Sequence, residues 1–139
     1  MGSHRTTVRL DEGTAFTGEL GGYNISIGAA PEDGSERKGV SPKALSLTSL
    51  AGCTAIDVIE MLRKMRQEID AFSVDAEGEE TEDHPRIFRE IVVTYRLKGR
   101  NIERDKVERA VQLSQEKYCG VSAMLGKAVP ITTKIVIDE

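Results

Sequence analysis

The first third of the chain alternates hydrophobic and polar residues in short runs that turn residues separate. The runs are residues 7–10, 14–19 and 23–27. In the last run, Tyr23, Ile25 and Ile27 alternate with polar residues, a period of two that is typical of a half-buried strand. The pattern therefore predicts three short strands, followed by an exposed polar loop over residues 29–40.

A long helix is predicted after this loop. Ser41 followed by Pro42 is a typical helix start, with a capping hydroxyl and a proline in the first turn. The helical pattern continues to about Ile69 without another proline. Residues 44–59 are almost uncharged, and a helix that is apolar on all sides is a buried one. We therefore expect the first half of this helix, which contains Cys53, to be buried.

The rest of the chain predicts strands and helices in mixed order. Strands are expected at residues 72–77, 87–97 and 131–137, and helices at residues 103–117 and 119–127. Gly99 is expected to end the second of these strands, whose Ile91, Val93, Tyr95 and Leu97 share one face. Hairpins dominate this order, so we predict an α+β fold rather than a wound parallel sheet.

Length and charge narrow the class of protein. The 139 residues predict one domain, residues 1–139, in which residues 1–4 are interpreted as a tag remnant. A net charge of −4 argues against a nucleic-acid binder, which would carry a basic excess. We see no apolar run of the ~20 residues that span a bilayer and no secretory leader. A cytoplasmic protein without nucleic-acid or membrane partners is expected.

The two cysteines, Cys53 and Cys119, are the main candidates for chemistry. They lie 66 residues apart without a CxxC motif, and the two histidines are distant in sequence, so we expect no metal site. The acidic residues 77–83 lack the spacing of a calcium loop. Cys119 precedes a predicted helix, and Lys117 is close to it in sequence; both features would lower a thiol pKa. The residues alone leave open a redox pair or two structural thiols.

Two motifs around these cysteines resemble the OsmC/Ohr family of osmotically induced and organic hydroperoxide resistance proteins. The run from Ser41 to Val58, with Ala51-Gly52-Cys53-Thr54, is similar to the central-helix motif of that family. Residues 109–119, which end in Lys117-Tyr118-Cys119, resemble its second cysteine motif. Pro85-Arg86-Ile87-Phe88 resembles a segment of one OsmC-like subgroup. The resemblance extends over about residues 5–138.

The resemblance implies an OsmC-like fold, with antiparallel sheets around a long buried central helix and an intertwined homodimer. It implies a thiol peroxidase that reduces organic hydroperoxides without a cofactor. Cys53 would be the peroxidatic thiolate, and Cys119 would resolve its sulfenic acid as a disulfide. An external dithiol, such as a lipoyl-type reductant, would then regenerate the enzyme. Thiolate attack followed by trapping with a second thiol is consistent chemistry.

One part of the family's catalytic machinery is missing from the sequence. The peroxidase branch has an acidic residue near the start of the central helix, and this residue pairs with an arginine that stabilises the thiolate. Here Lys43-Ala44 occupy that stretch. Arg37 and Arg86 are the candidate thiolate-activating residues, although a solvated surface position is the simpler interpretation of each. The alternative function is therefore a non-enzymatic domain of the same fold that binds a small molecule or senses oxidants.

Overall fold

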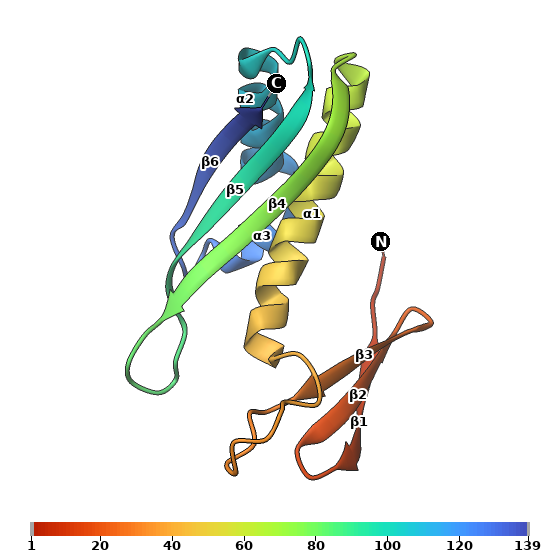
Figure 1. Cartoon of the computed structure of the whole chain (residues 1–139), viewed down its shortest axis with the longest axis vertical. Helices are drawn as coiled ribbons and strands as arrows, with labels where there is room; N and C mark the ends of the chain where they lie inside the picture. The colour runs from red at the N-terminus through yellow and green to blue at the C-terminus, as the bar shows by residue number, and fades with distance from the viewer. Residues whose placement is uncertain (1, 139) are drawn as a thin grey trace. The chain divides into compact units, whose positions relative to one another are not determined.

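The computed structural model describes residues 2–138, which form an α+β fold (Figure 1). Its elements in chain order are β1 (Thr6–Glu12), β2 (Ala15–Leu20), β3 (Tyr23–Gly28), α1 (Pro42–Lys64), β4 (Glu68–Glu80), β5 (Phe88–Arg100), α2 (Arg104–Leu113), the π-helix η1 (Ser114–Tyr118), α3 (Gly120–Leu125) and β6 (Ile131–Asp138). They divide into two compact units, residues 1–46 and residues 47–139. The predicted fold class and every predicted strand and helix are confirmed, with changes in their bounds.

The first unit contains an antiparallel sheet in the order β1-β2-β3. The turn between β2 and β3 places Gly21 and Gly22 at φ values of +57° and +84°, which glycine adopts without steric cost. Because the strands pair by short hairpins, the alternation in the sequence was enough to predict them. Much of their apolar surface is exposed: Leu10 is 61% and Tyr23 is 78% accessible.

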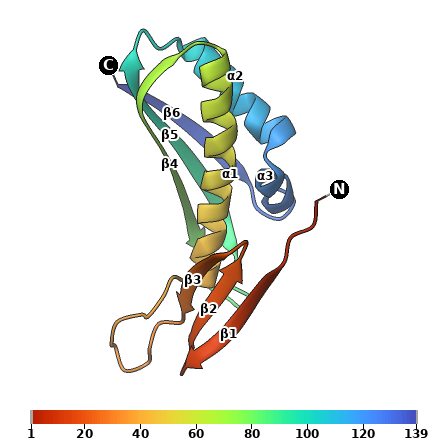
Figure 2. The same ribbon diagram turned by 90° about the vertical axis from the view of Figure 1, so that its right-hand side faces the viewer.

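The second unit contains a sheet in the order β4-β5-β6, with α1, α2 and α3 on one of its faces (Figures 1 and 2). β4 and β5 are antiparallel, whereas β5 and β6 are parallel. The expectation of purely antiparallel sheets is therefore wrong here. The chain returns from β5 to β6 through α2, η1 and α3, and such a helical crossover is what joins neighbouring parallel strands.

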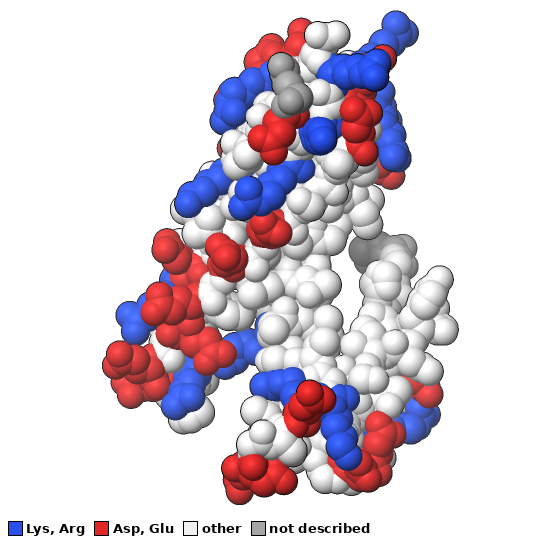
Figure 3. All heavy atoms as spheres, viewed as in Figure 1, with Lys and Arg blue, Asp and Glu red and all other residues white. Residues whose placement is uncertain are grey.

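The hydrophobic core lies between this sheet and its helices. Ile91, Val93, Tyr95 and Leu97 point inward from β5 and are almost completely buried, as the alternation predicts. From α1, a stripe of residues spaced four apart faces them: Leu50, Thr54, Val58 and Leu62. The side of the sheet away from the helices carries mixed acidic and basic side chains (Figure 3), among them the ion pair of Arg96 with Asp75.

Helix α1 ends five residues earlier than expected, at Lys64. Arg66 adopts φ +60°; the N–H of Gln67 bonds to the carbonyl of Leu62, and the N–H of Arg66 bonds to that of Arg63. This is a Schellman motif with an arginine where glycine is usual, so no glycine in the sequence marked the end. The chain then enters β4 at Glu68, four residues before the predicted strand.

Helix α1 is not buried on all sides, in contrast to the sequence prediction. One stripe of the helix is buried, while Ile56 is 60% exposed and Cys53 is half-buried. The expectation that no apolar run is long enough to span a bilayer is wrong for α1, which passes that criterion by length and composition; core helices of soluble proteins pass it too. Its buried stripe shows that this helix packs in a core.

Two further boundaries differ from the prediction. Gly99 does not end β5, which continues to Arg100. A Cβ atom at Gly99 would lie 2.1 Å from the carbonyl oxygen of Glu68, so glycine is required there by the close approach of β4. The helix predicted over residues 103–117 is α2 followed by the π-helical turn η1, and it buries Val107, Ala110, Val111 and Ser114.

Candidate functional site

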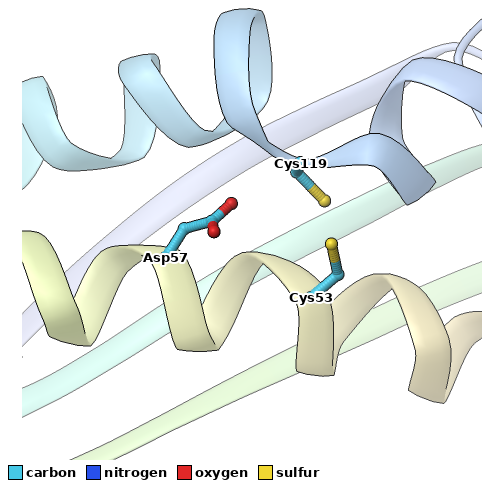
Figure 4. A group of neighbouring side chains, drawn as sticks. All are labelled: Cys53, Asp57 and Cys119. Carbon is cyan, nitrogen blue, oxygen red and sulfur yellow. The ribbon is translucent and has the colours of Figure 1, made fainter. Parts of the chain in front are cut away.

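The fold of the second unit brings the two cysteines together. Cys53 lies on α1, and Cys119 lies between η1 and α3. Their sulfur atoms and a carboxylate oxygen of Asp57 all lie within 4.8 Å of one another, and the two thiols point toward each other (Figure 4). Both cysteines are free thiols. The juxtaposition that the sequence left open is thus present in the structure.

The positions of Cys53 and Asp57 follow from helix geometry. Residues four apart lie on the same face of an α-helix, so both side chains project from α1 toward the segment that contains Cys119. Cys53 is half-buried and therefore accessible in part, whereas Cys119 is only 3% exposed. Of the two sulfurs, the one on α1 is better placed to meet a small molecule from solvent.

The π-helical turn η1 positions Cys119. The N–H of Cys119 bonds to the carbonyl of Ser114 at 2.7 Å, a reach of five residues rather than four. Such turns insert one residue into a helix and occur often at functional sites. Cys119 then caps α3, since its sulfur accepts the N–H of Ser122 at 3.4 Å.

The expectation that the helix start and Lys117 lower the pKa of Cys119 is wrong. Burial is the largest influence and raises the pKa of the Cys119 thiol; the neighbouring Cys53 raises it further, and the contacts with Ser122 only partly oppose this. Lys117 places its ammonium over the ring of Tyr118, 5.3 Å from the ring centroid. α3 has only six residues, so its N-terminal dipole is small compared with the cost of desolvating a thiolate.

A chain of buried hydrogen bonds leads to Asp57. The Gln115 amide donates to the Tyr95 hydroxyl at 2.8 Å, and this hydroxyl is 2.7 Å from that of Thr54. The Thr54 hydroxyl is 2.8 Å from that of Ser114, which donates to Oδ2 of Asp57 at 2.9 Å. Tyr95, Thr54 and Ser114 are fully buried.

The order of these groups fixes the direction of the chain. A carboxylate only accepts hydrogen bonds, and each hydroxyl has one proton to donate. Ser114 donates to Asp57, so it accepts from Thr54, which in turn accepts from Tyr95. Every proton in the chain therefore points toward Asp57. This arrangement holds the carboxylate in a fixed orientation beside the two thiols.

The candidate activating arginines have other partners. Nε of Arg86 donates to the carbonyl of Glu82 at 3.2 Å, in the hairpin between β4 and β5. The guanidinium of Arg37 donates to the carbonyl of Gly28 in the first unit. Their roles toward Cys53 remain predictions.

Asp57 and the hydroxyl chain behind it were not among the residues predicted from the sequence. Asp57 was visible as the one ionisable side chain besides Cys53 in an otherwise uncharged stretch, and it stands four residues after Cys53. That spacing is the signal that would have paired the two on one helix face. Nothing in the sequence connects Thr54 with Tyr95 or Ser114, because the sheet and the crossover bring them together.

Comparisons with known proteins agree with the fold. A sequence profile of the family described as OsmC-like protein matches residues 33–134. Protein YhfA of Escherichia coli K12 is 40% identical over 126 residues, which cover 90% of this chain and 91% of that protein. A hypothetical protein from Aquifex aeolicus has a TM-score of 0.89 at 30% identity, with 99% of this chain and 98% of the other covered. The organic hydroperoxide resistance protein OhrB of Bacillus subtilis has a TM-score of 0.64 at 20% identity, with coverages of 96% and 98%, which shows a shared fold.

Proposed function

Because this chain belongs to the OsmC-like family, we propose that it is a thiol-dependent peroxidase that reduces organic hydroperoxides. The observation that carries the proposal is the pair of facing thiols, one half-buried on α1 and one buried beside it. A relative of the same fold is an organic hydroperoxide resistance protein. Defence against oxidative damage in the cytoplasm is the corresponding role.

The proposed reaction has three steps. The Cys53 thiolate attacks the distal peroxide oxygen and the O–O bond breaks, which leaves a sulfenic acid on Cys53. The alkoxide takes up one proton, equivalent to the one that the Cys53 thiol lost, and leaves as the alcohol. The Cys119 thiol then attacks that sulfur, forming a disulfide and releasing water. An external dithiol, for which a lipoyl-type compound is our candidate, exchanges with this disulfide and restores both thiols. The steps need no resident metal or organic cofactor.

Asp57 supports this sequence of steps in place of the acidic residue that Lys43-Ala44 lack. Its carboxylate oxygen lies within 4.8 Å of both sulfurs, and the hydrogen bond from Ser114 holds it in place. A carboxylate in this position accepts the proton that each thiol must lose.

The direct test is intact mass and non-reducing peptide mapping after one equivalent of cumene hydroperoxide. A Cys53–Cys119 disulfide is expected in the wild-type protein. Cys119→Ser should stop at sulfenic or higher oxidised forms of Cys53, and Cys53→Ser should lose peroxide consumption altogether. Absence of any oxidised Cys53 would contradict the proposal.

A non-enzymatic sensor or small-molecule binding protein is the second candidate, favoured by Lys43 at the acidic position of the family. Such a protein would be oxidised once without turnover. Steady-state consumption of hydroperoxide in the presence of a dithiol distinguishes the two. Turnover that disappears in Cys53→Ser excludes the sensor.

We also propose that the protein is a homodimer. The first unit exposes large apolar side chains on its sheet: Val8, Leu10, Leu20 and Tyr23. The second unit exposes Ile56 on α1 and Met124 on α3. Surfaces of this kind are typical of interfaces between subunits. Sedimentation equilibrium should give twice the mass of one chain.

A further inference from the structure

The site contains three side chains that are ligands of soft divalent cations. Two thiols and a carboxylate present ligand atoms that all lie within 4.8 Å of one another (Figure 4). Around a tetrahedral zinc ion with Zn–S bonds of about 2.3 Å, two sulfur ligands are separated by about 3.8 Å. The sulfur pair, at most 4.8 Å apart, thus needs to close by no more than about 1 Å to hold such an ion. The expected absence of a metal site rested on the 66 residues between the cysteines, the lack of a CxxC motif and the distant histidines; the fold removes the argument from separation and supplies Asp57 in place of a histidine.

The surroundings of Asp57 have the form of a metal-ligand support. A ligating carboxylate is commonly oriented by a hydrogen bond from a second residue, and here Ser114 donates to Oδ2 at 2.9 Å. The chain of hydroxyls behind Ser114 fixes this orientation from the buried side.

A second observation points to a ligand at this place. The hydroxyl of Ser122, a residue that is 5% exposed, has no hydrogen-bond partner among residues 2–138. The backbone N–H of Ser122 bonds to the sulfur of Cys119, and its side chain is also among the groups that act on that thiol, so the hydroxyl lies beside Cys119. An unpaired buried hydroxyl is costly, and a water on a bound cation would satisfy it.

We propose that the reduced protein binds one thiophilic divalent cation of the zinc type through Cys53, Cys119 and Asp57. The cation displaces one proton from each thiol, and both protons go to solvent. Two thiolates and one carboxylate around a divalent cation leave a net charge of −1 and an open fourth position for water. Thiolate ligands favour zinc over magnesium or calcium, which prefer oxygen.

The cation and the disulfide exclude each other, since both use the same two sulfurs. The bound cation therefore protects Cys53 and Cys119 from oxidation and alkylation, and occupancy reports that the pair is reduced. This inference does not require peroxide turnover, and the peroxidase proposal does not require a cation.

The test is an anaerobic titration of the reduced full-length protein with Cd²⁺, followed by the ultraviolet sulfur-to-cadmium charge-transfer band. The zinc affinity is measured separately by competition with a chromophoric chelator. We expect saturation at one equivalent with an absorbance typical of two thiolates. Wild-type protein whose thiols have been alkylated should show no band, with unchanged circular dichroism.

The variants locate the third ligand. Ser114→Ala should weaken zinc binding by about 10-fold or more, the usual effect of removing an outer hydrogen bond to a ligand. Asp57→Asn should weaken it further, and Cys53→Ser or Cys119→Ser should abolish the two-thiolate band. Asp75→Asn, an exposed carboxylate of the same unit, is the matched control and should bind as the wild type does.

Two results would overturn the proposal. One is the absence of a charge-transfer band at one equivalent of Cd²⁺. The other is equal zinc affinity in Asp57→Asn and the wild type, which would reduce the site to a simple dithiol. A failed Cd²⁺ titration would leave disulfide formation with cumene hydroperoxide untouched, so the failures of the two proposals are distinguishable.

Discussion

The two compact units are each built on a three-stranded sheet, but they use their apolar residues differently. In the second unit, α1, α2 and α3 cover one face of the sheet, and all the buried hydrophobic residues of the described core belong to it. The sheet of the first unit leaves Leu10, Leu20 and Tyr23 exposed. A sheet becomes a stable support for chemistry only when one face is covered, and the thiol pair lies in the unit where this is so.

The largest expected difference in the free energy of unfolding is between the alanine variants of two leucines. Leu62 is fully buried on α1, and Leu10 is 61% exposed on β1. Leu62→Ala should lower the free energy of unfolding by about 2–5 kcal/mol, because it removes apolar contacts and leaves a cavity. Leu10→Ala should cost the single chain less than about 0.5 kcal/mol.

Urea denaturation at two protein concentrations measures the free energy of unfolding of both leucine variants. A large cost of Leu10→Ala at high concentration that shrinks on dilution would show that a partner covers the first sheet. Equal costs for the two leucines at every concentration would contradict the comparison.

A smaller contrast is expected between two threonines. Thr54 lies in the buried hydroxyl chain, whereas the Thr17 hydroxyl donates to Asp11 on the surface of the first unit. Thr54→Val keeps the shape but removes the acceptor of the Tyr95 hydroxyl proton and the donor to the Ser114 hydroxyl, so a loss of about 1–3 kcal/mol is expected. Thr17→Val should stay within about 0.5 kcal/mol of the wild type.

Thermal and urea unfolding measure the stability of the Thr54→Val and Thr17→Val variants against the wild type. Thr54→Val should also slow disulfide formation with cumene hydroperoxide, since Asp57 loses its fixed orientation. Thr54→Val with wild-type stability would show that the buried chain is not needed to hold the second unit together.

The smallest expected effect is a pH dependence from Tyr95. Burial raises the pKa of this phenol above its ordinary value near 10, and the hydrogen bond that the Gln115 amide donates to the phenol oxygen partly opposes this. The unfolded chain loses the phenol proton first as the pH rises. The contribution of Tyr95 to stability is therefore complete below about pH 10 and declines as the pH rises toward the folded-state pKa.

Difference spectra of tyrosinate and urea denaturation above pH 9 measure this decline. Tyr95→Phe should remove the latest-titrating phenol and flatten the alkaline loss of stability. Tyr23→Phe, at an exposed position of the first unit, is the control and should leave that loss in place. An alkaline profile that Tyr95→Phe does not alter would contradict the assignment.

Local signals predicted most of the fold, and their failures have local causes. Alternation located the strands, and Ser41-Pro42 marked the start of α1. The end of α1 was misplaced because Arg66 adopts the left-handed conformation that glycine usually marks. Gly99 was interpreted as the end of β5 because its true role, the close approach of Glu68, depends on a neighbouring strand.

The sequence by itself determined the elements, the inward face of β5 and the importance of two cysteines in family-like motifs. These follow from periodicity and from residues near one another in the chain. Only the tertiary structure decided that Cys53, Asp57 and Cys119 meet. It also decided that burial raises the pKa of Cys119, where the helix start and Lys117 were expected to lower it. Both depend on the packing of α1 against the segment around Cys119, 66 residues after Cys53. The burial of a thiol and the distances between side chains far apart in sequence exist only in the folded chain.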